Sequence, residues 1–301
     1  MSDKAFENMS GAYAAMYTPF TAEGKIDEAM IERQVEFGIA NGLRGFYLTG
    51  STGEGMLMSY EERKLVYERV VKACAGRTKT IAHVGTISAD ESARLARAAA
   101  DAGCDWASSI WPVFYGRAFD CAYDYYRRLS EATDLPFMVY AFGADIVPDR
   151  DAKLFDLRNV RGMKYTGHSV WNAARLRNRL NKETAFFAGA DEQALCSMSM
   201  KDVFCGCIGT SQNSVPHVFS ELCDCVNRNN LARASELQGQ IVRFVEVILA
   251  RSNGSWHKAS MRYIGLDCGS ARAPNGWPLT DAEYRELAAA LDKLGFVKKA
   301  I

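Results

Sequence analysis

The stretch KTIAHVGTISADESARLARAAADAGCDWASSIWP, residues 79–112, decides the fold. It begins with a short apolar run (79–85), continues through an amphipathic segment (91–103) and ends with a second apolar run (106–112). Ser88 and Glu91 have the spacing of a capping box, which predicts that a helix begins between the two runs. The stretch therefore predicts a strand, a helix and a second strand, the unit from which parallel sheets are built.

The same alternation continues through most of the chain. Eight apolar runs are predicted to be strands, at residues 12–19, 45–50, 79–85, 106–112, 136–142, 160–167, 185–191 and 203–210. They do not alternate cleanly between apolar and polar side chains, which is typical of parallel strands covered on both faces. A second capping box, Ser59 with Glu62, marks another helix start. Eight strand–helix units in about 230 residues predict an α/β fold, the closed (β/α)8 TIM barrel. An open doubly wound sheet is the alternative that a strand count leaves open.

The final part of the chain has a different pattern. After about residue 230 the strand pattern gives way to helical segments, among them LARASELQGQIVRFVEVILA and LTDAEYRELAAALDKLG, with no linker-like composition before them. We therefore expect residues 1–230 to form the catalytic barrel and residues 231–301 to form a helical extension packed on it.

Composition excludes several classes of protein. The 301 residues carry 36 basic and 36 acidic side chains, and no basic patch suggests nucleic acid as a partner. The N-terminal residues lack the apolar core of a signal peptide, and no apolar run has membrane-spanning length, so we expect a cytoplasmic protein without a membrane partner. Neither the 9 cysteines nor the 4 histidines have metal-ligand spacing, so we interpret the cysteines as buried thiols and the histidines as structural.

The turn GSTGEG (50–55) follows the second predicted strand, where βα loops of a barrel carry chemistry. Its backbone N–H groups and the hydroxyls of Ser51 and Thr52 suit a small carboxylate. It lacks the Gly-Lys-Ser/Thr of a phosphate-binding loop. An ordinary glycine-rich turn is the alternative.

The stretch GMKYTGHS (162–169) places Lys164 near the end of a predicted buried strand, with Thr166 on the same face. In the barrel interior, desolvation would leave part of the amine uncharged and able to attack a ketone carbon. Tyr140, on the preceding strand, would then lie close enough to transfer protons. The alternatives are a lysine that reaches for solvent and a tyrosine that only fills the barrel.

Two adjacent carboxylates, Asp191 and Glu192, follow the seventh predicted strand in the sequence AGADE (188–192). A carboxylate pair accepts several hydrogen bonds and would suit sugar hydroxyls. The alternative is that they cap the helix that follows.

Taken together, GFYLTGSTGEG (45–55), IAHVG (81–85), Tyr140, GMKYTG (162–167) and the segment from Lys258 to Pro274 resemble the dihydrodipicolinate synthase/N-acetylneuraminate lyase superfamily. The resemblance covers roughly residues 10–275. It implies a class I aldolase or dehydratase, a homotetramer that uses pyruvate or another 2-oxo acid and needs neither metal nor organic cofactor.

The resemblance also implies roles for single residues. Lys164 would be the Schiff-base lysine, Tyr140 the proton-shuttling phenol, and Ser51 and Thr52 the groups that hold the 2-oxo-acid carboxylate. Tyr115, preceded here by Phe114, matches an aromatic pair that reaches into a neighbouring subunit's site.

The local sequence is most similar to the N-acetylneuraminate lyase branch, in which the matching positions contact the polyhydroxylated part of the sugar: Thr166, Gly189, Asp191, Glu192 and Thr210. The condensing branch has an arginine five residues after the tyrosine, where this chain has Asp145. The sequence Tyr140-Ala-Phe-Gly143 and Ala190 depart from the lyase pattern, so another 2-oxo-3-deoxy sugar acid is an alternative substrate. Two further alternatives are a metal-dependent aldolase or hydrolase and a non-catalytic sensor that binds 2-oxo acids.

Overall fold

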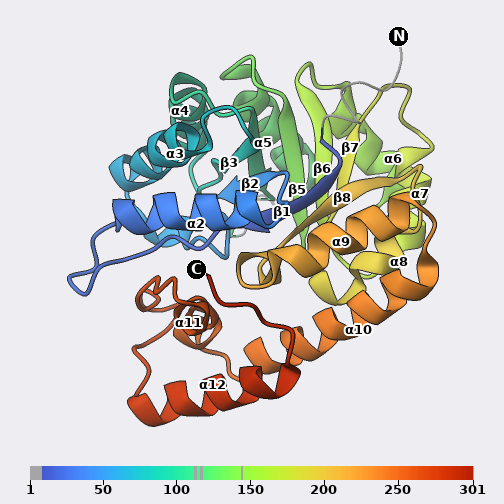
Figure 1. Cartoon of the computed structure of the whole chain (residues 1–301). Coiled ribbons are helices and arrows are strands. Elements are labelled where there is room, and N and C mark those ends of the chain that lie inside the picture. Colours follow the sequence, from blue (N-terminus) through green and yellow to red (C-terminus); the bar gives the residue numbers. More distant parts are fainter. Residues whose placement is uncertain (1–8, 112–113, 116–117, 144, 301) are drawn as a thin grey trace.

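The chain folds into a closed barrel of eight parallel strands in sequence order, with β8 paired to β1 (Figure 1). The computed structural model describes residues 9–111, 114–115, 118–143 and 145–300. The strands are β1 (Gly11–Ala15), β2 (Gly45–Leu48), β3 (Lys79–His83), β4 (Trp106–Ile110), β5 (Phe137–Phe142), β6 (Val160–Thr166), β7 (Ala185–Ala188) and β8 (Phe204–Gly209). The predicted (β/α)8 barrel is confirmed, and the open-sheet alternative is wrong.

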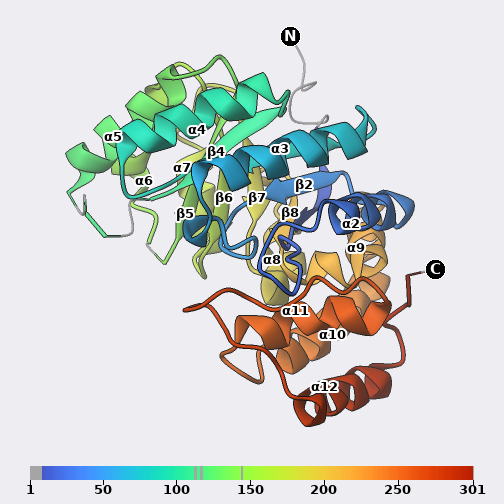
Figure 2. The same cartoon turned by 90° about the vertical axis from the view of Figure 1, so that its left-hand side faces the viewer.

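Helices follow the strands and cover the outside of the barrel (Figures 1 and 2). The α-helices of this part are α2 (Glu28–Ala40), α3 (Tyr60–Cys74), α4 (Ala89–Asp101), α5 (Phe119–Glu131), α6 (Pro148–Asp151), α7 (Val170–Arg177), α8 (Ala194–Met198) and α9 (Pro216–Asn227). Short 3-10 helices lie between them: η1 (Gly55–Leu57), η2 (Ala152–Asp156), η3 (Asp191–Gln193) and η4 (Ser211–Asn213).

The two predicted capping boxes differ in the structure. Ser59 and Glu62 form both reciprocal hydrogen bonds at the start of α3. At α4, one half of the predicted box forms within the described residues, because the Ser88 side chain accepts from the Glu91 N–H. Both helices nevertheless begin directly after the predicted cap.

Three further helices make up the end of the chain: α10 (Leu231–Ile248), α11 (Gly254–Ile264) and α12 (Asp281–Leu294). Figures 1 and 2 show them together on one side of the barrel, with α12 farthest from it. Helix α10 packs on α9 and on η3, so the extension lies against the loops that follow β7 and β8. Within the described part of the chain, every helix is too short or too polar to cross a bilayer.

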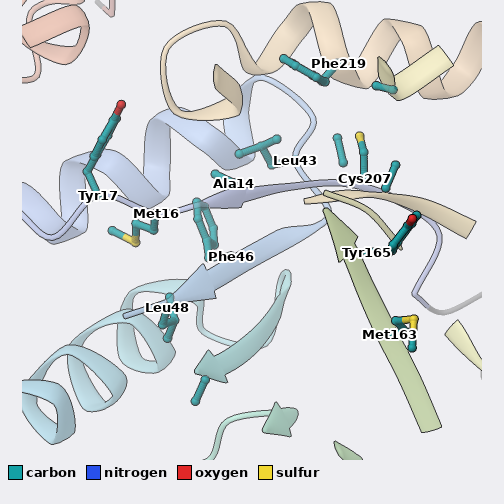
Figure 3. Close-up of a cluster of buried hydrophobic side chains, with 14 of the residues drawn as sticks. Ala14, Met16, Tyr17, Leu43, Phe46, Leu48, Met163, Tyr165, Cys207 and Phe219 are labelled. Carbon is teal, nitrogen blue, oxygen red and sulfur yellow. The ribbon is translucent and has the colours of Figure 1, made fainter. Parts of the chain in front are cut away.

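Strand side chains divide between two apolar cores because successive residues point to opposite faces. The outer core lies between sheet and helices; Figure 3 labels Ala14, Phe46, Leu48 and Met163 from the strands and Phe219 from α9 among its members. The inner core fills the barrel with alternate residues: Tyr13, Tyr47, Ile81, Met138, Tyr140 and Phe187 are examples. The inner core determines the surroundings of the site, because a polar side chain that points into the barrel is packed among these residues.

Candidate active site

Strand β6 places Lys164 inside the barrel. Its register partners are Tyr140 on β5 and Phe187 on β7, both members of the inner core. Lys164 is only 5% exposed, and it forms no ion pair within the described residues. Met163 and Tyr165 point to the opposite face and pack in the outer core, as the alternation predicted (Figure 3). The solvent-seeking alternative for this lysine is therefore wrong.

Two tyrosine rings face the Lys164 amine. Nζ lies 4.2 Å from the centroid of the Tyr140 ring and 4.4 Å from that of Tyr47. Burial raises the pKa of the Tyr47 hydroxyl well above its usual value, and this hydroxyl lies 3.0 Å from Ser108 Oγ. The Tyr47 side chain is therefore uncharged at ordinary pH. The distance from Lys164 Nζ to the Tyr140 ring confirms the predicted closeness of these two residues.

A second buried cation and a neutral imidazole lie close to this end of the barrel. Arg63 is 1% exposed and donates hydrogen bonds to the carbonyl oxygens of His83 and Gly85. His83 Nε2 accepts the Ile110 N–H at 3.0 Å. Burial, followed by the charges of Arg63 and Lys164, lowers the pKa of His83 well below its usual value. His83 therefore adds no positive charge of its own beside these two cationic side chains. Two buried cations favour an anionic ligand at this end of the barrel.

The Gly50–Gly55 turn follows β2 and closes on itself. The Gly55 N–H donates to the Gly50 carbonyl oxygen at 3.1 Å, and the Glu54 N–H donates to that of Ser51 at 3.1 Å. Thr52 Oγ1 lies 2.6 Å from Thr210 Oγ1, which joins the turn to the loop after β8. The predicted hydroxyl-rich turn is thus held at the same end of the barrel as Lys164.

Asp191 and Glu192 differ in their surroundings although they are adjacent. Asp191 is 8% exposed, and its Oδ2 accepts the Ser211 N–H at 2.8 Å. Burial raises the pKa of the Asp191 carboxyl, and the hydrogen bonds from Ser211 act in the opposite direction. Neither carboxylate caps η3. Glu192, unlike Asp191, is exposed. Asp191 therefore ties the loop after β7 to the loop after β8, and Glu192 is the carboxylate with free access to solvent.

Gly189 leaves room for a buried hydroxyl. A Cβ atom at Gly189 would lie 2.0 Å from Thr166 Oγ1, so a larger residue would displace that side chain. Thr166 Oγ1 is buried and has no hydrogen-bond partner among the described residues. An unpaired buried hydroxyl is unfavourable in a folded protein, which makes this atom a candidate contact for a ligand.

A cavity of about 320 Å³ brings most of the predicted residues together. It is lined by nine of them: Ser51, Thr52, Tyr140, Lys164, Thr166, Gly189, Asp191, Glu192 and Thr210. Tyr115 is the exception, because it does not line this cavity and is 67% exposed beside Phe114. The described structure thus gives Tyr115 no place in the site of its own chain.

One part of the cavity lining was missed by the sequence reasoning. It comes from the C-terminal extension, which contributes Val245, Ile248, Leu249 and His257. His257 Nε2 lies 3.0 Å from the Arg251 carbonyl oxygen, and burial lowers the pKa of its ring. The interpretation of all four histidines as purely structural is therefore incomplete. No sequence signal marks Val245, Ile248 and Leu249, since helix-face residues that line a cavity have the same apolar pattern as core residues.

The cavity has an uneven charge distribution. Lys164 is the single lysine or arginine among the lining residues that the structure describes, and Asp145 is not one of them. In the described ranges, no group of three or more histidine, cysteine, aspartate or glutamate side chains is arranged to hold a metal ion. The site therefore combines one amine, several hydroxyls and two carboxylates.

A (β/α)8 barrel with a buried amine near the end of β6, in a cavity that a hydroxyl-bearing turn after β2 also lines, suits a Schiff-base aldolase. Comparison of the chain with known protein families and structures agrees with this class. The chain belongs to the Dihydrodipicolinate synthetase family, whose sequence model matches residues 8–294. It is therefore an enzyme of the carbon–carbon lyase class, a pyruvate-dependent aldolase that acts through an imine.

Individual relatives cover nearly the whole chain. An N-acetylneuraminate lyase of Rhizobium meliloti (strain 1021) is 32% identical over 269 residues, which are 88% of this chain and 89% of the relative. The crystal structure of N-acetylneuraminate lyase from Mycoplasma synoviae superposes with a TM-score of 0.88 at 29% identity, covering 97% of this chain and all of that one. A dihydrodipicolinate synthase from Acinetobacter baumannii, complexed with pyruvate, gives a TM-score of 0.88 at 27% identity, covering 96% of this chain and all of that one.

Proposed function

We propose that the protein cleaves N-acetylneuraminate, or a related 2-oxo sugar acid, to pyruvate and an aldehyde sugar such as N-acetylmannosamine. The observation that carries the proposal is the enclosed Lys164 amine, which forms no ion pair within the described residues and shares a cavity with the hydroxyls of the Gly50–Gly55 turn. Lysine is rarely buried without a partner, and in a cavity such a lysine is suited to nucleophilic chemistry.

The cavity supports the following sequence of steps. Ser51 and Thr52 bind the substrate carboxylate, and the Lys164 amine attacks the C2 ketone carbon to give a carbinolamine. Loss of water gives a protonated imine, which is the electron sink. Tyr140, or the substrate carboxylate next to it, takes the proton of the C4 hydroxyl, and the C3–C4 bond electrons move into the imine to give an enamine. Protonation at C3 and hydrolysis release pyruvate and restore the amine. These steps require neither metal nor organic cofactor.

The far end of the cavity favours a hydroxylated substrate over one with a second carboxylate. Thr166, Glu192 and Thr210 offer hydrogen-bonding groups there, and among the described lining residues there is no arginine or second lysine. The names of the relatives agree with a sialic acid as substrate. Phe142 and Ala190, which depart from the lyase pattern, also line the cavity, so a 2-oxo-3-deoxy sugar acid is the second candidate.

Assembly is part of the proposal. Phe114 and Tyr115 form an exposed aromatic pair with ring centroids 4.8 Å apart, after β4. We infer a cytoplasmic homotetramer in which Tyr115 of one copy reaches the cavity of another. Light scattering would measure the assembly, and Tyr115→Phe should lower the turnover number without changing the assembled mass.

Borohydride trapping tests the proposed chemistry. Reduction in the presence of pyruvate should add a pyruvate-derived mass to the peptide that contains Lys164 and abolish activity. Absence of the adduct, or full turnover by Lys164→Ala, would show that the imine mechanism is wrong. Loss of activity with a chelator, with borohydride harmless, would instead favour a metal-dependent enzyme.

A substrate panel tests the finer assignment. Pyruvate release would be measured with N-acetylneuraminate and with 2-oxo-3-deoxygluconate. Release from the second alone would overturn the proposed substrate and leave the mechanism standing. Ligand-induced stabilisation without aldehyde product from any substrate would favour a 2-oxo-acid sensor.

A further inference from the structure

A fully buried ion pair lies behind the Gly50–Gly55 turn. Glu54 Oε1 accepts a hydrogen bond from Lys258 Nζ at 3.0 Å, and the two side chains are 2% and 1% exposed. Glu54 is the fifth residue of the turn and adopts the left-handed conformation, with φ of 59°. Lys258 belongs to α11, more than two hundred residues later. The pair therefore joins the turn to the C-terminal extension.

The surroundings of the pair satisfy both charges. Glu54 Oε2 accepts the Arg272 N–H at 2.7 Å, and Lys258 Nζ also donates to the Ser270 carbonyl oxygen at 3.4 Å. The Phe20 ring covers the ammonium group, with its centroid 4.1 Å from Nζ. Burial lowers the pKa of Lys258, and the charge of Glu54 acts in the opposite direction. The Glu54 carboxylate thus fixes three separate segments at one point.

The position of Glu54 determines the position of the residues that line the cavity. Its N–H donates to the Ser51 carbonyl oxygen, so the two residues belong to one closed turn. Thr52, between them, reaches Thr210 from the same turn. On the other side of the pair, His257 precedes Lys258 and lines the cavity. A displacement of Glu54 would therefore move both the Ser51 and Thr52 hydroxyls and the α11 wall.

A purely structural role explains this arrangement poorly. Replacing a buried ion pair with apolar residues of similar volume is often neutral or stabilising, because removing two charges from water is unfavourable. An apolar contact would hold α11 against the turn equally well. It would not fix the orientation of the turn, which a charged hydrogen bond does through its direction and length.

We propose that Glu54 and Lys258 are positioning residues that hold the Gly50–Gly55 turn in the geometry that binds the substrate's 2-oxo-acid carboxylate. The inference rests on the proposed function, since it assumes that this turn receives the carboxylate. The pair acts on binding and leaves the chemistry at Lys164 unchanged.

Three variants test the proposal. Glu54→Gln keeps the shape of the side chain, and the double variant, Glu54→Leu with Lys258→Met, removes both charges. Glu286→Gln is the control. The control loses an exposed ion pair between Arg251 and α12, in the same extension but away from the turn. KM and kcat for the 2-oxo sugar acid, and borohydride trapping over a series of pyruvate concentrations, are measured beside the thermal midpoint.

In the first two variants we expect KM, and the pyruvate concentration for half-maximal trapping, to rise roughly tenfold or more, because a charge-assisted contact to the carboxylate is weakened. We expect kcat to change by less than about threefold and the control to match the wild type. A folded double variant with unchanged KM would overturn the proposal, and so would a loss confined to kcat. If Glu54→Gln does not fold, the double variant decides, and if neither folds the pair is structural and the proposal is wrong. Absence of trapping in the wild type would instead refute the proposed function itself.

Discussion

Replacing Lys164 with methionine should make the protein more stable and inactive. The lysine side chain is 5% exposed and lacks an ion-pair partner in the described part of the chain. Burying an ammonium group costs several kcal/mol even after the structure relaxes. The Tyr140 and Tyr47 rings, 4.2 and 4.4 Å from Nζ, offset this by about 0.5–2 kcal/mol each. The remaining unfavourable energy is about 1–3 kcal/mol.

Methionine fills nearly the same space without the charge, so Lys164→Met should recover this energy. For a chain of this size, about 1 kcal/mol raises the thermal midpoint by roughly 2 °C. We therefore expect an increase of about 2–6 °C, measured by calorimetry without ligand, together with complete loss of pyruvate release.

The control for this experiment is a ligand titration. Pyruvate should raise the midpoint of the wild type, since it binds the folded state, and should leave that of Lys164→Met nearly unchanged. A variant that is less stable than the wild type would refute the reasoning, because it would mean that the barrel interior stabilises the ammonium group.

Three further predictions concern residues around the cavity. Burial raises the pKa of Asp191, so the folded state holds a proton there more tightly than the unfolded chain does. Asp191→Asn should therefore be more stable than the wild type at neutral pH. Thermal melts should show this difference in stability shrinking as the pH falls through the raised pKa. The pKa shift of His83 has the opposite direction: its pKa is lowered in the folded state, so the unfolded chain binds the proton first as the pH falls. Urea titrations should therefore show the free energy of unfolding decreasing below about pH 6.5, and decreasing less steeply in His83→Gln. A Cβ at Gly209 would lie 1.7 Å from Asp191 Oδ1, so Gly209→Ala should destabilise the fold by about 1–3 kcal/mol in urea, and Asp191→Ala should reverse part of that loss.

The barrel could be predicted from the sequence because its signals are local. Each strand is a short apolar run, and helix starts carry their own caps, as Ser59 does. Strand alternation was enough to place Lys164 and Thr166 on one face, and neighbouring strands brought Tyr140 beside the lysine. The face on which each strand residue lies, and which strands are neighbours, were accessible in this way.

The far wall of the cavity could not be predicted, because it depends on where a helix packs. Val245 and Ile248 are ordinary apolar residues of α10, and nothing local distinguishes them from core residues. The internal bonding of Asp191 was equally hidden, since the Ser211 N–H that it accepts becomes a neighbour only when β7 and β8 pair. Contacts between segments distant in the sequence require the folded structure.

The contribution of α11 has a consequence for how the protein is made. A ribosome builds the lysine-bearing strand and all of its neighbours long before it reaches Lys258, the residue that secures the turn. Until then the growing polypeptide has its amine but lacks one wall of the cavity and the anchor of the turn. The cavity would thus be complete only when synthesis has passed α11, and a chain that ends before this helix would lack His257 from the cavity wall and Lys258 from the turn.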